Sequence, residues 1–174
     1  PNCTFDELLR PTGFVVPGGD TATLNAMSNP AIRGYIRSAA KDADWIVSVC
    51  TGALILASVG LLEGREVTTH WAYRDYLPAF GARYVQKRWT HNGKIINSAG
   101  VSAGIDMALY LASQMAGPET ARNVQLMVQY DPHPPFGGID YAHMGFFPRL
   151  MRSANSLRSV FYTSKPRQMT RQGI

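Results

Sequence analysis

Residues 45–54, Trp45-Ile46-Val47-Ser48-Val49-Cys50-Thr51-Gly52-Ala53-Leu54, join an apolar, β-branched run to a run of small and helix-forming residues. This pattern predicts a strand that passes directly into a helix, with Cys50 at the corner. Such a sharp turn exposes its central side chain only where the neighbouring residues are small, as Ser48 and Gly52 are. Because a helix N-terminus favours negative charge, the position also favours the thiolate form of Cys50. We therefore interpret Cys50 as a reactive residue; the alternative is an inert cysteine buried in the core.

The composition is typical of one globular domain with a sizeable core. The chain has 174 residues, of which 45% are hydrophobic and 17% charged. Its apolar runs are all shorter than the roughly 20 residues that a membrane helix needs, so we expect no membrane association. The two cysteines, Cys3 and Cys50, do not predict a disulfide framework and fit a reducing cytoplasm. We expect no metal, because no Cys-rich or His-rich cluster is present, and no cofactor.

The net charge of +5 comes from the end of the chain. Residues 149–174 hold six of the 17 basic residues and no acid, which leaves 11 basic against 12 acidic residues elsewhere. We predict an α/β domain at residues 1–140 and a basic C-terminal extension at residues 141–174. A basic tail can contact nucleic acid, but a solvated chain end is the alternative, and we expect no nucleic-acid binding by the domain alone.

Strands and helices alternate along residues 13–130. We predict a buried strand at 13–17, a helix at 30–41, a strand at 66–70, a helix at 71–80, a hairpin turn at Asn92-Gly93, and helices at 105–115 and 118–130. This order predicts an α/β fold with a mostly parallel sheet flanked by helices, whose ligands bind at the C-terminal strand ends. Gly18-Gly19, Cys50, His70 and Gly100 each follow a predicted strand. We expect the strand that ends at His70 to lie beside the strand that ends at Cys50.

At these residues the sequence resembles the ThiJ/PfpI superfamily, and most closely its isonitrile hydratase-like branch. The matching motifs are Val16-Pro17-Gly18-Gly19, Val49-Cys50-Thr51-Gly52-Ala53, Thr68-Thr69-His70-Trp71, Phe80-Gly81-Ala82, residues 98–106 and residues 130–136. The resemblance implies the flavodoxin-like, class I glutamine amidotransferase-like fold. In that family, a first strand and helix carry an acidic residue that is hydrogen-bonded to the nucleophile. Nothing in residues 1–10 matches that stretch, so the domain looks truncated at its N-terminus and the acidic partner of Cys50 is not assigned.

The same resemblance implies a hydratase or hydrolase for a small molecule. Cys50 is the expected nucleophile, and it would form a thioimidate with an isocyanide that water converts to an N-substituted formamide. Thr51 and Gly19 are expected to offer backbone N–H groups to developing negative charge, the alternatives being a threonine that starts a helix and a plain glycine turn. His70 is expected to act as a base or to keep Cys50 ionised, the alternative being a structural histidine.

Other functions are compatible with the same motifs. PfpI-type proteases have histidine directly after the cysteine, where this chain has Thr51, so peptidase activity is disfavoured. The branch is also similar to the ligand-sensing domain of AraC-type transcription regulators. A redox or stress sensor that uses reversible oxidation of Cys50 is a third possibility. From the family we also expect a homodimer.

Overall fold

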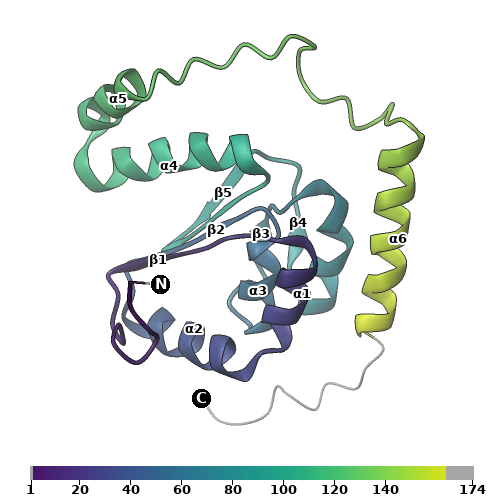
Figure 1. Cartoon of the computed structure of the whole chain (residues 1–174), viewed down its shortest axis with the longest axis horizontal. Coiled ribbons are helices and arrows are strands. Elements are labelled where there is room, and N and C mark those ends of the chain that lie inside the picture. Colours follow the sequence, from purple (N-terminus) through teal and green to yellow (C-terminus); the bar gives the residue numbers. More distant parts are fainter. Residues whose placement is uncertain (1, 164–174) are drawn as a thin grey trace.

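A four-stranded sheet with strand order β1-β2-β6-β5 forms the centre of the molecule. Its strands are β1 (Gly13–Val16), β2 (Trp45–Val49), β6 (Ile95–Ser98) and β5 (Trp89–Asn92). The first three run parallel, and β5 is antiparallel to β6. Figure 1 shows the sheet between helices in the computed structural model, which describes residues 2–163. The predicted α/β fold with a mostly parallel sheet flanked by helices is confirmed.

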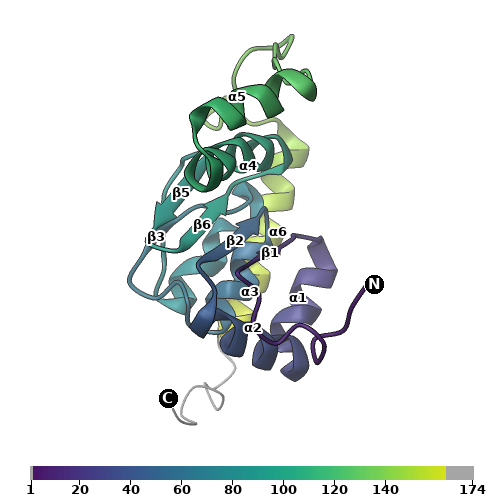
Figure 2. The same cartoon turned by 90° about the vertical axis from the view of Figure 1, so that its left-hand side faces the viewer.

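The two faces of the sheet are covered by different helices (Figures 1 and 2). One face packs against α1 (Asp20–Ser28), α2 (Pro30–Asp42) and α3 (Gly52–Ser58). The other packs against α4 (Val101–Ala116), which α5 (Pro118–Met127) covers in turn. Successive side chains of a strand point to opposite faces, so Ile46 belongs to the first core and Val47 to the second.

Local signals explain why several elements begin and end where they do. The Asn29 side chain accepts hydrogen bonds from the backbone N–H groups of Ala31 and Ile32, at 2.9 and 3.3 Å, and so caps α2 as its Asn-Pro start predicts. The predicted hairpin joins β5 to β6, with Asn92 opposite Ile95 and Gly93 at a φ of 63°.

The chain between α3 and β5 departs from the prediction. The strand expected at residues 66–70 is only β3 (Glu66–Val67), and it pairs with β4 (Arg83–Tyr84) in a separate two-stranded sheet. It therefore does not lie beside β2, whose neighbours in the main sheet are β1 and β6. The following helix, η1 (Trp71–Phe80), is a 3-10 helix that ends at Gly81, where φ is 73°.

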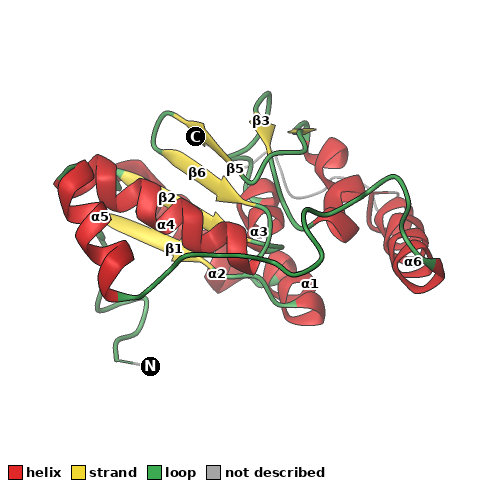
Figure 3. Cartoon of the chain, turned by 90° about the horizontal axis from the view of Figure 1, so that it is seen from above, coloured by secondary structure: helices red, strands yellow, loops and turns green. Residues whose placement is uncertain are grey.

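Two helices were not predicted, and one strand is less buried than expected. Helix α1 has only Thr23 and Met27 buried, so its sequence shows little helical periodicity. Helix α6 (Phe146–Thr163) packs against η1 on the side away from the sheet (Figure 3). The strand predicted as buried, β1, lies at the sheet edge, and Val15 is 58% exposed.

Two features concern the chain as a whole. None of the helices found between residues 2 and 163 combines the length and the apolar character that crossing a bilayer requires. The basic residues Lys165, Arg167 and Arg171 lie outside the described residues. The division into residues 1–140 and 141–174 stays a prediction.

Candidate active site

Cys50 lies at the corner between β2 and α3, in the conformation that a strand-to-helix elbow requires. Its φ of 59° is left-handed, which costs a residue with a side chain about 1 kcal/mol or more. The side chain is partly exposed, whereas all of α3 is buried. A Cβ at Gly52 would come within 2.1 Å of the Val16 carbonyl oxygen, so only glycine fits there. The predicted corner, with small residues around a reachable Cys50, is present in the structure.

The Gly18-Gly19 loop, which follows β1, lies directly against this corner. A Cβ on Gly18 would approach the Thr51 hydroxyl oxygen to 2.7 Å, the Thr51 backbone nitrogen to 2.8 Å and the Cys50 Cβ to 2.9 Å. The loop backbone is therefore packed against the elbow so closely that position 18 has no room for a side chain. The adjacent parallel strands β1 and β2 bring the two segments together, as the sequence predicts.

Thr51 connects the elbow to this loop through its side chain. Its hydroxyl oxygen accepts a 3.0 Å hydrogen bond from the Gly19 N–H and lies 2.8 Å from the hydroxyl oxygen of Thr23. Thr51 is only 2% exposed, so this hydroxyl serves the fold. The Gly19 N–H is thus already donated within the protein. No hydrogen bond between described residues uses the Thr51 backbone N–H.

His70 lines the same cavity as Cys50, although the strand before it does not lie beside β2 as the sequence predicts. The preceding residue, Thr69, donates a 2.8 Å hydrogen bond from its hydroxyl to the Cys50 carbonyl oxygen. The His70 side chain caps η1 by accepting the Ala72 N–H at Nδ1, at 3.4 Å, so neutral His70 carries its proton on Nε2. Burial lowers the pKa of His70 below its ordinary value and favours the neutral imidazole.

Tyr73 and Asp20 form a second polar pair beside the elbow. The Tyr73 hydroxyl donates a hydrogen bond to the carboxylate of Asp20, which begins α1. Burial and this carboxylate raise the pKa of Tyr73 well above its ordinary value, so Tyr73 keeps its proton. Asp20 lies where a helix N-terminus favours negative charge.

These groups line one cavity with a volume of about 580 Å³. Cys50, Thr51, Gly18, Gly19, His70, Tyr73 and Asp20 contribute from the elbow, the glycine loop, η1 and α1. Helix α6 supplies a further wall with Met151, Ala154, Asn155 and Arg158. The four predicted site residues Cys50, Thr51, Gly19 and His70 therefore share one cavity. Of the Gly100 turn, only the next residue, Val101, lines it.

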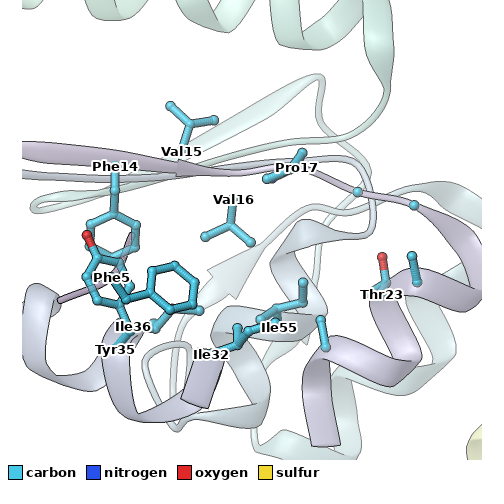
Figure 4. A pocket seen from close by; sticks show the side chains of 14 residues that line it. Phe5, Phe14, Val15, Val16, Pro17, Thr23, Ile32, Tyr35, Ile36 and Ile55 are labelled. Carbon is cyan, nitrogen blue, oxygen red and sulfur yellow. The ribbon is translucent and has the colours of Figure 1, made fainter. Parts of the chain in front are cut away.

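A second hollow of about 320 Å³ lies between β1 and the helices α1 and α2 (Figure 4). Its labelled side chains are mainly apolar, among them Phe14, Val16, Ile32 and Ile36. Cys50 and His70 do not line it. Gly18 and Gly19 border both hollows, so the glycine loop separates the apolar space from the polar one.

Sequence reasoning missed Asp20, Tyr73 and the residues of α6. Tyr73 lies three positions after His70, in the first turn of the helix predicted at residues 71–80. Residues three positions apart share one side of a helix, so this spacing is the signal that could have identified Tyr73. The α6 residues gave no comparable signal. Among residues 2–163, no group of three or more His, Cys, Asp or Glu side chains is arranged to hold a metal ion.

The fold and the site define a class of α/β protein in which a cysteine occupies a left-handed elbow after a parallel strand and faces a glycine loop from the neighbouring strand. The chain belongs to the DJ-1/PfpI family, whose profile matches residues 3–114. The isonitrile hydratase of Pseudomonas putida is 43% identical over 136 residues, which cover 78% of this chain and 59% of that protein. This chain thus spans less than two thirds of that relative.

Two further comparisons agree with this family. The HTH-type transcriptional regulator CdhR of Pseudomonas aeruginosa is 35% identical over 122 residues, or 67% of this chain and 34% of the regulator. The crystal structure of a ThiJ/PfpI family protein from Pseudomonas syringae superposes with a TM-score of 0.73 at 34% identity, covering 90% of this chain and 64% of that one. The resemblance inferred from the motifs is confirmed.

Proposed function

We propose that the protein is a cysteine-dependent isonitrile hydratase, which adds water to a small isocyanide to give an N-substituted formamide. The observation that carries the proposal is the left-handed Cys50 elbow, which opens on a cavity shared with Thr51 and His70. The 43% identity to an isonitrile hydratase supports the same reaction. Because a transcriptional regulator is also among the relatives, the proposed activity depends on the Cys50 elbow and the sequence identity together.

The first step forms a bond between the Cys50 sulfur and the terminal carbon of the isocyanide. That carbon takes a proton from water, which leaves a thioimidate and hydroxide. In this scheme the backbone N–H of Thr51, which takes part in no hydrogen bond between described residues, stabilises the negative charge that develops beside the sulfur. Gly19 acts in this scheme by holding the loop against Thr51, because its own N–H is donated to the Thr51 hydroxyl.

The second step returns the thiolate. Hydroxide adds to the thioimidate carbon, a proton moves from the new oxygen to the nitrogen, and the carbon–sulfur bond breaks to release the formamide. Neutral His70 carries its proton on Nε2 and is suited to position the water by donating a hydrogen bond. Of the two roles expected from the sequence, a base and a partner that keeps Cys50 ionised, the second is disfavoured, because burial works against an imidazolium here.

The test is formamide production from aliphatic and aromatic isocyanides by the intact protein, followed by mass spectrometry. Cys50→Ala should lower turnover at least about 100-fold, and Cys3→Ser, which changes the exposed cysteine, should not change it. Quenched reactions should show Cys50 carrying one isocyanide mass. Undetectable turnover with every isocyanide, or full turnover in Cys50→Ala, contradicts the proposal.

A ligand-sensing domain is the second candidate, and the similarity to the regulator CdhR favours it. A sensor would bind its ligand in the same cavity without turnover. Ligand-dependent thermal stabilisation that persists in Cys50→Ala, with no product formed by the unmodified protein, would select this candidate. Reversible oxidation of Cys50 is tested by mass spectrometry after mild peroxide treatment, and an unmodified Cys50 would exclude it.

A further inference from the structure

Helix α6 presents one side to the cavity that contains Cys50. Met151, Ala154, Asn155 and Arg158 line the cavity, and their spacing of three, four and seven residues is that of a single helical face. Cys50, Thr51, His70 and Tyr73 contribute to the same cavity from other elements. The α6 face therefore borders the space that a substrate attached to Cys50 would fill.

Asn155 has an unusual environment for a carboxamide. It is only 4% exposed, it lines the cavity, and its side chain makes no hydrogen bond to any residue that the structure describes. Its amide atoms are not among the fully enclosed unpaired atoms of the described residues, so they are open to the cavity. By contrast Ser159, one turn further along α6, is 5% exposed but donates to the Ser156 carbonyl oxygen at 2.6 Å. The Asn155 amide is thus left for a polar group inside the cavity.

Arg158 places a positive charge at the same wall. Its side chain is exposed and forms no hydrogen bond or ion pair with any residue in the described part of the chain. It acts electrostatically on Tyr73, where it favours negative charge. The neighbouring Arg152 differs, because it pairs with Asp75 of η1 at 3.6 Å and so attaches α6 to the rest of the fold.

Two other titratable groups at the cavity, Asp20 and His70, do not supply a positive charge. Asp20 accepts the Tyr73 hydroxyl and begins α1, so a hydrogen bond and a helix N-terminus stabilise its negative charge. His70 is favoured in its neutral form by burial. Arg158 is therefore the uncompensated cation among the charged side chains that line this cavity in the described structure.

We propose that Asn155 and Arg158 bind a carboxylate of the substrate, so that the molecule that reacts at Cys50 is a small organic acid with its electrophilic carbon at the opposite end. The guanidinium donates to a carboxylate with the geometry that carboxylates favour, and the Asn155 amide donates a further N–H to it. This inference deepens the proposed function and rests on it for the reaction, but not for carboxylate recognition.

The test measures carboxylate preference by a reaction that needs no hydratase activity. Maleimides add to thiols by forming one carbon–sulfur bond while the adjacent carbon takes a proton from water. In a Cys3→Ser background, Cys50 is alkylated by N-carboxyalkyl maleimides with one to five methylenes and by the matching primary amides. The ratio of the two rate constants, divided by the same ratio for N-acetylcysteine, measures recognition of the carboxylate.

We expect this normalised ratio to reach about fivefold or more at one chain length, which corresponds to about 1 kcal/mol. In Arg158→Gln the normalised ratio should fall to near one, whereas Arg158→Lys, which keeps the positive charge, should retain part of the preference. In Asn155→Asp the ratio should fall below one. Arg149→Gln is the matched control, because Arg149 is exposed and lies nine residues earlier on α6, about half a turn around the helix. It should leave the ratio unchanged. Thermal unfolding of each variant shows that α6 remains folded.

The outcomes separate this inference from the hydratase proposal. A normalised ratio near one at every chain length, or an equal ratio in Arg158→Gln and Arg149→Gln, overturns carboxylate recognition even if neutral isocyanides are hydrated. A preference that depends on Arg158 and Asn155 supports it even if no isocyanide is turned over. With turnover, an ω-isocyano acid should have a higher kcat/KM than its methyl ester, and Arg158→Gln should remove the difference.

Discussion

Replacing Gly52 by alanine tests the packing that builds the elbow. A Cβ at this position would lie 2.1 Å from the Val16 carbonyl oxygen and 2.9 Å from the Pro17 carbonyl oxygen. Both are backbone atoms in the segment that leads from β1 into the glycine loop, so no flexible side chain can move aside. To reach an ordinary contact distance, the start of α3 or the end of β1 must shift by about 1 Å.

Such overpacking costs about 1–3 kcal/mol where side chains adjust, and we expect about 3 kcal/mol or more against backbone. For a protein of this size 1 kcal/mol corresponds to about 2–4 °C, so the melting temperature should fall by about 6–12 °C. Thermal unfolding followed by circular dichroism measures the change. Because the shift displaces the Cys50 turn, alkylation of Cys50 should also change in rate.

Gly34→Ala is the matched control. Gly34 lies within α2, and a Cβ there meets nothing within 4 Å. Alanine favours a helix over glycine by about 0.5–1 kcal/mol, so this variant should melt at the same temperature or slightly higher. If Gly52→Ala unfolds within about 2 °C of the unmodified protein, the close approach of α3 to β1 is not as the structure places it.

Three other substitutions test single contacts. Thr51→Val removes the acceptor of the Gly19 N–H and the partner of Thr23, so urea unfolding should show a loss of about 1–3 kcal/mol, while Thr51→Ser should retain most of the stability. Burial lowers the pKa of His70, so the unfolded chain binds that proton at higher pH than the folded protein does, and stability should fall as the pH decreases below 6.5. His70→Gln should lose less stability between pH 7 and pH 5, and equal losses would refute this account. Asn29→Ala removes the cap of α2 and should cost about 1 kcal/mol, whereas Asn29→Ser should cost little.

The sequence predicted those parts of the site that depend on neighbouring residues. The Cys50 corner is a local pattern, because the β-branched run, the cysteine and Gly52 follow one another directly. The glycine loop was placed beside it correctly, because β1 and β2 are consecutive strands that pair in parallel. The expectation that consecutive strands lie side by side was wrong for the strand before His70, because β3 pairs with β4 outside the main sheet. His70 still reaches the cavity, since Thr69 is hydrogen-bonded to the Cys50 carbonyl.

What only the tertiary structure decided is the wall of the cavity opposite the elbow. Among the α6 side chains at residues 146–159, Asn155 and Ser159 are buried, so the inner face of this part of the helix is partly polar and shows no clear apolar period. Helix α1 escaped prediction for a related reason, because its buried Thr23 is held by a hydrogen bond to Thr51. Hydrophobic periodicity identifies helices that bury apolar faces, whereas helices that bury polar groups against a site become visible only when their partners are seen in space.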